Sequence, residues 1–353
     1  MGSRPSIALL FGGRSGEHEV SLRSGQSVAE GLRARYDVQA ILVERSGRWL
    51  FQGAEGPRPE GGEPVFLAPH PADRGVLRRL ADGSTLARPG VYFPVLHGPF
   101  GEDGTLQGLL ELAAVPFVGA GVAGSATGMD KELMKALFAH ADLPQVAWRA
   151  LRSRAGDHAR LLEDLGLPLF VKPANLGSSV GVSRVTTPEE LAPALDVAFA
   201  WDRKVIVEQG VDAREIEVGV LGNDAPEASV PGEIVPDRAF YDYDSKYAAD
   251  SNTELKIPAP VSEAQRRQLQ DLARRAFLAV DAAGYARVDF FVERGSGRVL
   301  LNEINTIPGF TSISMFPKLW KASGLDFVSL LERLIELAVE RHAQRQTQRD
   351  RLP

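Results

Sequence analysis

The chain has 353 residues, of which 44% are hydrophobic and 24% charged, and its formal net charge is −6. This composition is typical of a globular protein with two or three domains, and it disfavours nucleic-acid and membrane partners. The chain has no cysteine, which excludes disulfides, thiolate catalysis and cysteine-ligated metals. Without a signal-peptide pattern or an apolar run near the roughly 18 residues that span a bilayer, a cytoplasmic location is expected.

The first segment predicts a unit of the kind that binds nucleotides in α/β folds. A buried strand at Ser6–Gly13 runs into a glycine-rich loop, and a helix is expected from about Ser24. The loop lacks the G-x-G-x-x-G pattern of dinucleotide sites, which disfavours a Rossmann-type dehydrogenase. Glu17 in this loop suits a cation such as an ammonium group better than a phosphate, unless it is only an acidic residue at a helix start.

Two more strands are expected at Val38–Val43 and Val91–His97. Between them, residues 45–89 are rich in Pro and Gly and predict a surface insertion in which only Val76–Leu80 is helical. His97 opens a glycine-rich loop at the end of its strand, where α/β folds place their sites, so it is a candidate ligand contact. The alternative is a histidine that makes structural hydrogen bonds.

The first domain is expected to close at about residue 122. Before that point the pattern predicts a helix at Thr105–Leu112 and a short edge strand at Pro116–Val118. The Gly-, Ala- and Ser-rich stretch Gly119–Gly128 then marks the domain boundary.

Lysines and a loop of small residues characterise the next segment. A helix at Met129–His140 carries Lys131 and Lys135 off its apolar face, where lysines are usually solvated. The strand Leu167–Lys172, in contrast, is apolar and ends in a lysine. The Gly- and Ser-rich loop 173–182 can lie over phosphates, although it is not a Walker loop and a plain flexible hairpin has the same composition.

The remaining pattern predicts a helix at Pro188–Ala200, strands at Lys204–Gln209 and Glu215–Leu221, helices at Ser262–Ala283 and Leu325–Val339, and a frayed polar tail from His342. Glu215 and Glu217 are expected to alternate outward from their strand. Residues 235–260 are aromatic and lack periodicity, which predicts a lid or binding loop.

The segment Arg287–Met315 carries the clearest chemical pattern. Two apolar strands flank a Gly-Ser-Gly turn, with Asp289 on the first strand and Glu303 and Asn305 on one face of the second. A hairpin register could bring these three side chains together, and Mg²⁺ prefers oxygen ligands. The pattern therefore favours a magnesium–nucleotide site over a solvated hairpin edge.

The order of these segments resembles the ATP-grasp ligases and, within them, the D-alanine–D-alanine ligases. The matching segments cover almost the whole chain: GGRSGEHEVSLRSG, LHGPFGEDGTLQGLLEL, MDK, KPANLGSSVGVS, FYDYDSKY, ARVDFF and NEINTIPGFTSISM. The resemblance implies an α/β fold, with a Rossmann-like N-terminal domain at residues 1–122. A two-lobed, α+β ATP-grasp part would follow, with lobes at 123–212 and 213–353 and a lid at 235–260.

The resemblance also implies the chemistry. ATP would phosphorylate the carboxylate of one D-alanine, and the amine of a second would attack the acyl phosphate. The implied ATP contacts are Lys131, Lys172, Gly177, Ser178, Ser179, Val180, Glu208, Gln209, Val211, Glu215, Phe240, Lys246, Asn302 and Glu303. Two Mg²⁺ or Mn²⁺ ions would be held by Asp289, Glu303 and Asn305, and a potassium requirement is left open.

The implied amino-acid contacts lie in other segments. Glu17 would pair with the ammonium of the first D-alanine, His97 would assist near its carboxylate, and Arg287 with the Gly309 amide would stabilise the oxyanion. The other implied residues are Ser314 and the Met315 amide for the second carboxylate, and Ser178 and Tyr247 in a hydrogen-bonded trio with Glu17.

Tyr247 favours a dipeptide product over a D-lactate ester, because related ester-forming enzymes tend to carry Phe at this lid position. D-lactate or D-serine as the second substrate remains an alternative. A non-catalytic nucleotide-binding module of the same fold is another, although the intact set around Arg287 and Asp289 speaks against it. The expected partners are the small-molecule substrates and, by the resemblance, a second copy in a homodimer.

Overall fold

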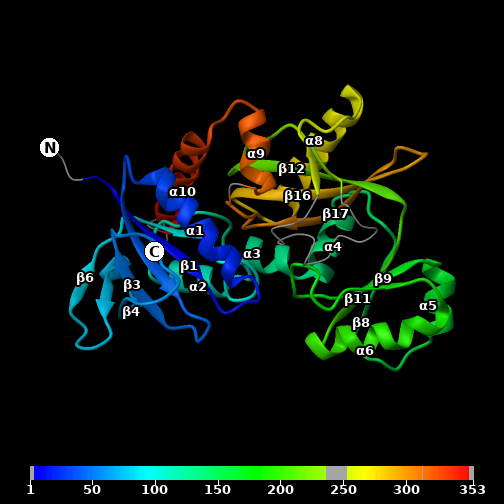
Figure 1. Cartoon of the computed structure of the whole chain (residues 1–353), viewed down its shortest axis with the longest axis horizontal. Helices are drawn as coiled ribbons and strands as arrows, with labels where there is room; N and C mark the ends of the chain where they lie inside the picture. Colours follow the sequence, from blue (N-terminus) through cyan, green and yellow to red (C-terminus); the bar gives the residue numbers. More distant parts are fainter. Residues whose placement is uncertain (1–3, 236–252, 312, 350–353) are drawn as a thin grey trace.

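The computed structural model describes residues 4–235, 253–311 and 313–349. Three β-sheets with their helices form the molecule, and the largest sheet lies at the opposite end from the other two (Figure 1). This arrangement confirms the expected α/β class. Among the described residues, no helix is long and apolar enough to cross a membrane.

The first sheet has seven strands in the order β6-β5-β4-β3-β2-β1-β7. Its elements and their helices are β1 (Ser6–Gly12), α1 (His18–Leu32), β2 (Asp37–Val43), β3 (Trp49–Gly53), β4 (Glu63–Leu67), β5 (Leu77–Arg79), β6 (Thr85–Ala87), β7 (Val91–Pro94) and α2 (Thr105–Leu112), with a 3₁₀ turn at Pro71–Asp73. Strand β1 pairs in parallel with β2 and β7, whereas the strands from β3 to β6 pair antiparallel. Phe117 adds a single parallel bridge to Tyr92, where the edge strand was expected.

The expected helix at Val76–Leu80 was wrong, because this segment contains strand β5. The four short strands within residues 45–89 extend the first sheet. Val65 and Leu67 on β4 pack with Leu77 in a buried cluster, which sets the register of these strands. The apolar spacing in this stretch therefore reports packing between strands rather than one face of a helix.

Helix α1 begins six positions before the expected Ser24. Its first turns carry polar residues, but tertiary hydrogen bonds bury them: Ser21 Oγ accepts from the Gly12 amide at 2.8 Å and donates to the Val95 carbonyl at 2.6 Å. A buried histidine, His18, contacts the Gly13 carbonyl in the same way. Polar side chains satisfied by loops cannot be recognised as a core face from apolar periodicity alone.

The middle of the chain forms four α-helices and a four-stranded antiparallel sheet with the order β10-β9-β11-β8. The elements are α3 (Val122–Met129), α4 (Lys131–His140), β8 (Trp148–Leu151), α5 (His158–Leu165), β9 (Leu169–Pro173), β10 (Ser183–Val185), a 3₁₀ turn at Pro188–Glu190, α6 (Leu191–Trp201) and β11 (Val205–Gln209). The stretch predicted as a Gly-rich boundary is helix α3, whose small residues allow close packing against neighbouring backbone.

The third sheet has the order β15-β14-β12-β16-β17, with β13 paired to β12. The elements are β12 (Ala213–Gly222), β13 (Glu227–Ala228), β14 (Gly232–Val235), β15 (Glu254–Lys256), α8 (Glu263–Ala279), β16 (Gly284–Glu293), β17 (Val299–Asn305), α9 (Met315–Ala322) and α10 (Phe327–Arg349). Strands β14 and β15 lie at the two ends of the segment predicted as a structureless lid. Its middle, residues 236–252, lies outside the described residues.

Helix α10 packs on the first domain, and its buried residues share one core with α1, β1 and β7. The tail from His342 was expected to fray but continues the helix to Arg349. Ion pairs from Arg35 to Glu332 and from Arg345 to Glu111 join α10 to the N-terminal domain. The end of the chain is thus part of the N-terminal unit.

Candidate active site

The hairpin of β16 and β17 brings the predicted polar residues together. In its register Asp289 lies opposite Glu303, and Arg287 lies opposite Asn305. The Asn305 amide donates to Asp289 at 3.0 Å. The guanidinium of Arg287 makes a bidentate hydrogen-bonded ion pair with the carboxylate of Asp289, and both N–O distances are 2.7 Å. The hairpin is therefore a charged, hydrogen-bonded cluster and not a solvated edge.

Glu217 also belongs to this cluster, although the sequence predicted it to point outward. It is buried on β12, opposite Asp289 in the register, and its carboxylate lies 3.1 Å from the Arg287 guanidinium. Burial opposes the charge of Arg287, but Asp289 and Glu217 raise the pKa of this guanidinium well above its usual value. Arg287 is therefore a permanent cation with two carboxylate partners.

Oxygen donors around the hairpin fit a divalent cation. Two carboxylates and one amide meet at neighbouring positions, which suits Mg²⁺ when phosphate oxygens complete its shell. Within the described residues there is no group of three or more His, Cys, Asp or Glu side chains placed to hold a metal. Of the predicted metal ligands, Asp289 and Glu303 are carboxylates and Asn305 is an amide.

Lys131 stands at the first position of α4, beside this cluster. Asp130 caps the helix by accepting from the amides of Glu132 and Leu133, and the buried Lys204 in turn pairs with Asp130. The Lys131 ammonium donates to the Leu176 carbonyl at 2.8 Å and lies 3.9 Å from Glu303. The helix start thus aims this lysine between the Gly/Ser loop and the hairpin.

Three side chains that the sequence placed apart form a buried cluster, which we call the lysine–glutamate–lysine cluster: Lys135, Glu208 and Lys172. One carboxylate oxygen of Glu208 lies 2.8 Å from Lys135 and the other lies 2.6 Å from Lys172. Lys135, predicted to be solvated, is only 1% exposed, and Glu208, predicted to lie at a strand exit, is 3% exposed. Burial opposes ionisation of Glu208, but the two lysines lower its pKa to about 2, so it is ionised.

The Gly/Ser loop contacts the first domain. Ser178 Oγ donates to the Glu17 carboxylate at 2.5 Å, so two members of the predicted trio are in contact. Ser178 and Ser179 have positive φ angles of 52° and 60°, a conformation that is uncommon outside glycine. Two adjacent serines held in this way are a local strain of the kind found at ligand-binding loops.

His97 joins the first domain to the loop after β17. Its Nδ1 lies 2.9 Å from the Ile307 carbonyl, which can only accept, so Nδ1 carries the proton. Its Nε2 then accepts from Ser24 Oγ at 3.1 Å. Burial lowers the pKa of His97, which keeps the ring neutral. These contacts fit the structural alternative for this histidine, because both ring nitrogens are engaged.

The same loop carries the predicted oxyanion and carboxylate contacts. Phe310 is buried among aromatic rings of β7, β16 and α9, and its amide donates to Ser24 Oγ at 3.3 Å. Gly309 must be small, because a Cβ there would lie 2.8 Å from Ser314 Oγ. Ser314 occupies the position before α9, whose first residue is the buried Met315.

The other predicted contacts are spread along neighbouring strands. Gln209 is exposed at the end of β11, while Val211, Glu215 and Asn302 are half-buried. Gly177 lies against Glu17, and the Val180 amide donates to the Gly177 carbonyl at 3.3 Å. Phe240, Lys246 and Tyr247 lie outside the described residues.

Sequence reasoning missed a carboxyl group beside this site. Glu102 accepts from the Gly98 amide at 3.0 Å, and its other oxygen is shielded from solvent without a hydrogen-bond partner among the described residues. Burial, together with the nearby Glu17 carboxylate, raises the pKa of Glu102 to about 8. Its position in the loop after His97 was the only signal in the sequence.

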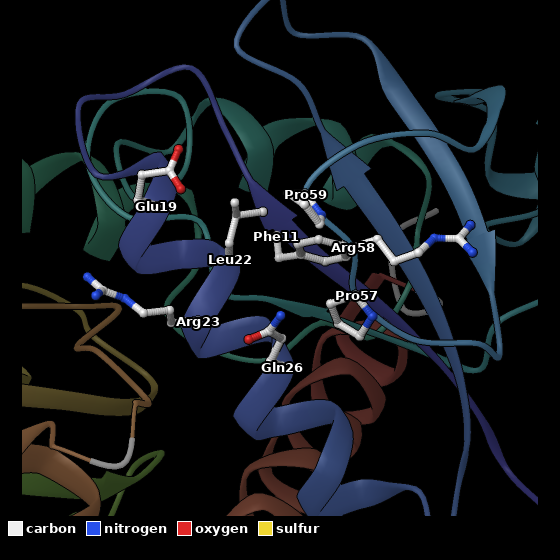
Figure 2. A pocket seen from close by; sticks show the side chains of 8 residues that line it. All are labelled: Phe11, Glu19, Leu22, Arg23, Gln26, Pro57, Arg58 and Pro59. Carbon is white, nitrogen blue, oxygen red and sulfur yellow. The ribbon is translucent and has the colours of Figure 1, made fainter.

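A cavity of about 230 Å³ lies outside this site, between α1 and the loop joining β3 to β4 (Figure 2). Phe11 and Leu22 line it in the middle of the view, while the guanidinium groups of Arg23 and Arg58 point away from them (Figure 2). Its remaining lining residues are Glu19, Gln26, Pro57 and Pro59. None of the predicted contacts lines this cavity, so it is separate from the candidate active site.

Comparison with known proteins finds relatives that match almost the whole chain. A family model described as "D-ala D-ala ligase N-terminus" matches residues 6–120, and one described as "D-ala D-ala ligase C-terminus" matches residues 137–336. The D-alanine–D-alanine ligase of Heliobacterium modesticaldum is 49% identical and covers 99% of both chains. That of a Thermoanaerobacter strain is 47% identical over 96% of this chain and 98% of its own.

The solved structures that superpose on this chain include ligases of the same kind. The D-alanine–D-alanine ligase of Coxiella burnetii superposes with a TM-score of 0.86 at 38% identity, covering 98% of this chain and 97% of its own. The VanG D-Ala:D-Ser ligase of Enterococcus faecalis superposes with a TM-score of 0.84 at 34% identity, covering 95% and 100%.

Proposed function

The chain belongs to the D-alanine–D-alanine ligase family, and from that premise we propose that it joins two D-alanines with the conversion of ATP to ADP and phosphate. The observation that carries the proposal is one arrangement: Lys131 contacts both the Gly/Ser loop and the acidic hairpin, and these segments match those of the family. The product would serve peptidoglycan synthesis.

The reaction has two bond-forming steps. The carboxylate of the first D-alanine attacks the γ-phosphorus of ATP, which gives an acyl phosphate and ADP. The amine of the second D-alanine then attacks the acyl carbon, loses a proton and expels phosphate from the tetrahedral intermediate. Both steps require neutralised charge and exclusion of water more than covalent help from the protein.

The lysines supply positive charge to the phosphates. Lys131 lies between the Gly/Ser loop and the hairpin, and Lys172 pairs with Glu208. Both lysines are mostly buried, so their charges act in a medium that screens them weakly. The amides of the loop from Gly177 to Val180 would cap the same phosphates. Gln209, Val211 and Glu215 would meet the adenine and ribose at the strand ends.

Asp289, Glu303 and Asn305 would hold the divalent cations, two Mg²⁺ or Mn²⁺ in our proposal. When bound, such ions neutralise the charge on the phosphoryl group that is transferred. Arg287 has Glu217 as a second carboxylate partner, so its position does not depend on Asp289 alone.

The proposed amino-acid contacts come from the first domain, the hairpin and the loop that follows the hairpin. Glu17, oriented by Ser178, would bind the ammonium of the first D-alanine. Arg287 and the Gly309 amide would stabilise the oxyanion of the tetrahedral intermediate. Ser314 and the Met315 amide would bind the second carboxylate. His97 would act mainly by holding the loop of Ile307 in place, given its two hydrogen bonds.

The lid completes the proposal. Residues 235–260, with Phe240, Lys246 and Tyr247, would close over ATP and protect the acyl phosphate from hydrolysis. We also propose a cytoplasmic location, where ATP is available, and a homodimer formed through the first domain.

The discriminating assay mixes the protein with Mg-ATP and D-alanine alone, L-alanine alone, or D-alanine together with D-lactate or D-serine. We expect phosphate release and dipeptide with D-alanine, no product with L-alanine, and weaker product formation when D-lactate or D-serine is offered as the second substrate. Turnover with L-alanine but not D-alanine would refute the proposal. A preference for D-serine would move the chain to the activity named for the VanG relative.

Two variants on one hairpin control this assay. Glu303→Gln removes a proposed metal ligand and is expected to reduce turnover about 100-fold or more while the protein stays folded. Glu293→Gln changes an acid at the far end of β16, which pairs with Arg298, and should leave turnover unchanged.

A further inference from the structure

Lys135 is a buried cation that the proposed reaction does not use directly. Its side chain is 1% exposed, so it cannot reach a nucleotide phosphate. It contacts the Glu208 carboxylate at 2.8 Å and, more weakly, the Asn302 carbonyl at 3.4 Å. Burial opposes the charge on this lysine and lowers its pKa. A buried charge is unfavourable unless it is paired, and Glu208 is the partner here.

In the lysine–glutamate–lysine cluster, one carboxylate pairs with two cations. Each oxygen of Glu208 faces one lysine, Lys135 on the inner side and Lys172 on the more accessible side, where it is 13% exposed. The pairing of β11 with β9 places Glu208 and Lys172 on the same face of the sheet, because Ile206 lies opposite Lys172 and Glu208 lies opposite Phe170. Lys135 reaches the same carboxylate from helix α4.

Nucleotide binding would disturb this balance. In the proposed function, Lys172 must direct its ammonium to phosphate oxygens, which are stronger anionic partners than a shared carboxylate. Without Lys135, Glu208 would then remain buried with no cationic partner, and an uncompensated buried charge is strongly unfavourable. With Lys135 in place, Glu208 keeps one ion pair throughout.

We propose that Lys135 is a positioning residue for ATP, the second counter-ion that holds Glu208 in place and so allows Lys172 to bind the nucleotide phosphates. This inference rests on the proposed nucleotide site. It predicts that Lys135 affects nucleotide affinity and leaves D-alanine affinity nearly unchanged, although it touches neither substrate.

The test measures ADP and ATP binding by calorimetry with full-length protein in the absence of amino acids. Lys135→Met keeps the length of the side chain and removes its charge. We expect nucleotide affinity to fall about tenfold or more and the KM for ATP to rise in parallel, with the KM for D-alanine within about twofold of the wild type. Arg78→Met breaks a partly buried ion pair in the first domain and is the control for general destabilisation.

A double variant makes the test independent of folding. Lys135→Met with Glu208→Gln removes the carboxylate that Lys135 balances and keeps an acceptor oxygen, so it should fold and bind nucleotide more tightly than Lys135→Met alone. Wild-type affinity in the folded Lys135→Met protein, or a double variant no better than the single one, would overturn the inference. Because binding is measured without D-alanine, failure of the dipeptide assay is a separate result.

Discussion

At the scale of single residues, Glu102 is a buried carboxyl group near the candidate active site for which the described part of the chain provides no ion pair. Its carboxyl group accepts one amide hydrogen bond, and its raised pKa of about 8 follows from burial and from Glu17. Burial of an acid in this way stabilises its neutral form relative to its charged form.

The sign of the pH effect follows from this shift. Below the ordinary value of 4.5, Glu102 is neutral in both the folded and the unfolded chain. Between that value and about 8, the unfolded chain releases the proton first, so its contribution to folding stability falls as pH rises. Above about pH 8 the full cost of the buried carboxylate is present.

Glu102→Gln should therefore be more stable than the wild type in alkaline solution. The variant keeps the acceptor for the Gly98 amide and carries no charge at any pH. Urea unfolding at about pH 9 should give a higher free energy of unfolding for the variant, by a few kcal/mol at most, and the difference should vanish near pH 5. An equal difference at both pH values would contradict the assignment.

At the scale of elements, glycines decide how closely two helices approach their neighbours. Helix α3 packs against the turn after α8, where a Cβ on Gly124 would lie 2.3 Å from the Asp281 carbonyl oxygen. Gly108, in the middle of α2, has nothing within 4 Å of the same position. The two glycines look equivalent in the sequence, but their surroundings differ.

These two positions give opposite predictions for one substitution. Gly124→Ala must push helix α3 away from backbone and should lower the free energy of unfolding by about 1–3 kcal/mol. Gly108→Ala gains helix propensity and should raise it by about 0.5–1 kcal/mol. Thermal unfolding of both variants beside the wild type measures the difference. Stabilisation by Gly124→Ala would show that α3 does not make this contact.

The elements also show where the sequence was sufficient. The helix Thr105–Leu112, the helix predicted at Ser262–Ala283 and observed at Glu263–Ala279, and the hairpin of Asp289 and Glu303 were predicted from local pattern, because their periodicity and caps are local. Strand β5 and helix α3 were not. Their packing partners lie elsewhere in the chain, in β4 for the first and in the turn after α8 for the second.

At the scale of the whole molecule, the last helix stabilises the first domain. Leu331 of α10 is fully buried in the core shared with α1 and β1, and a Cβ on Gly31 of α1 would lie 2.6 Å from its side chain. Leu195, equally buried, belongs to the separate core of the central sheet.

Truncation at these two leucines should therefore act at opposite ends of the molecule. Leu331→Ala should cost about 2–5 kcal/mol and speed amide hydrogen exchange in β1 and β2, some 300 positions away in the sequence. Leu195→Ala should speed exchange in β9 and β11 and leave β1 protected. Faster exchange in β1 from both variants would mean that the cores unfold as one unit.

The sequence by itself determined the α/β class, the order of the Gly/Ser loop, the aromatic segment and the acidic hairpin, and the family that they match, because these depend on residue type and short-range spacing. Only the tertiary structure decided which partner each charge has. Lys135 and Glu217 looked solvated because a buried charge and an exposed one have the same local pattern. Each of these buried charges is compensated by a partner on a strand that is distant in the sequence, a carboxylate for Lys135 and a guanidinium for Glu217. Such a pair exists only once the sheets have formed.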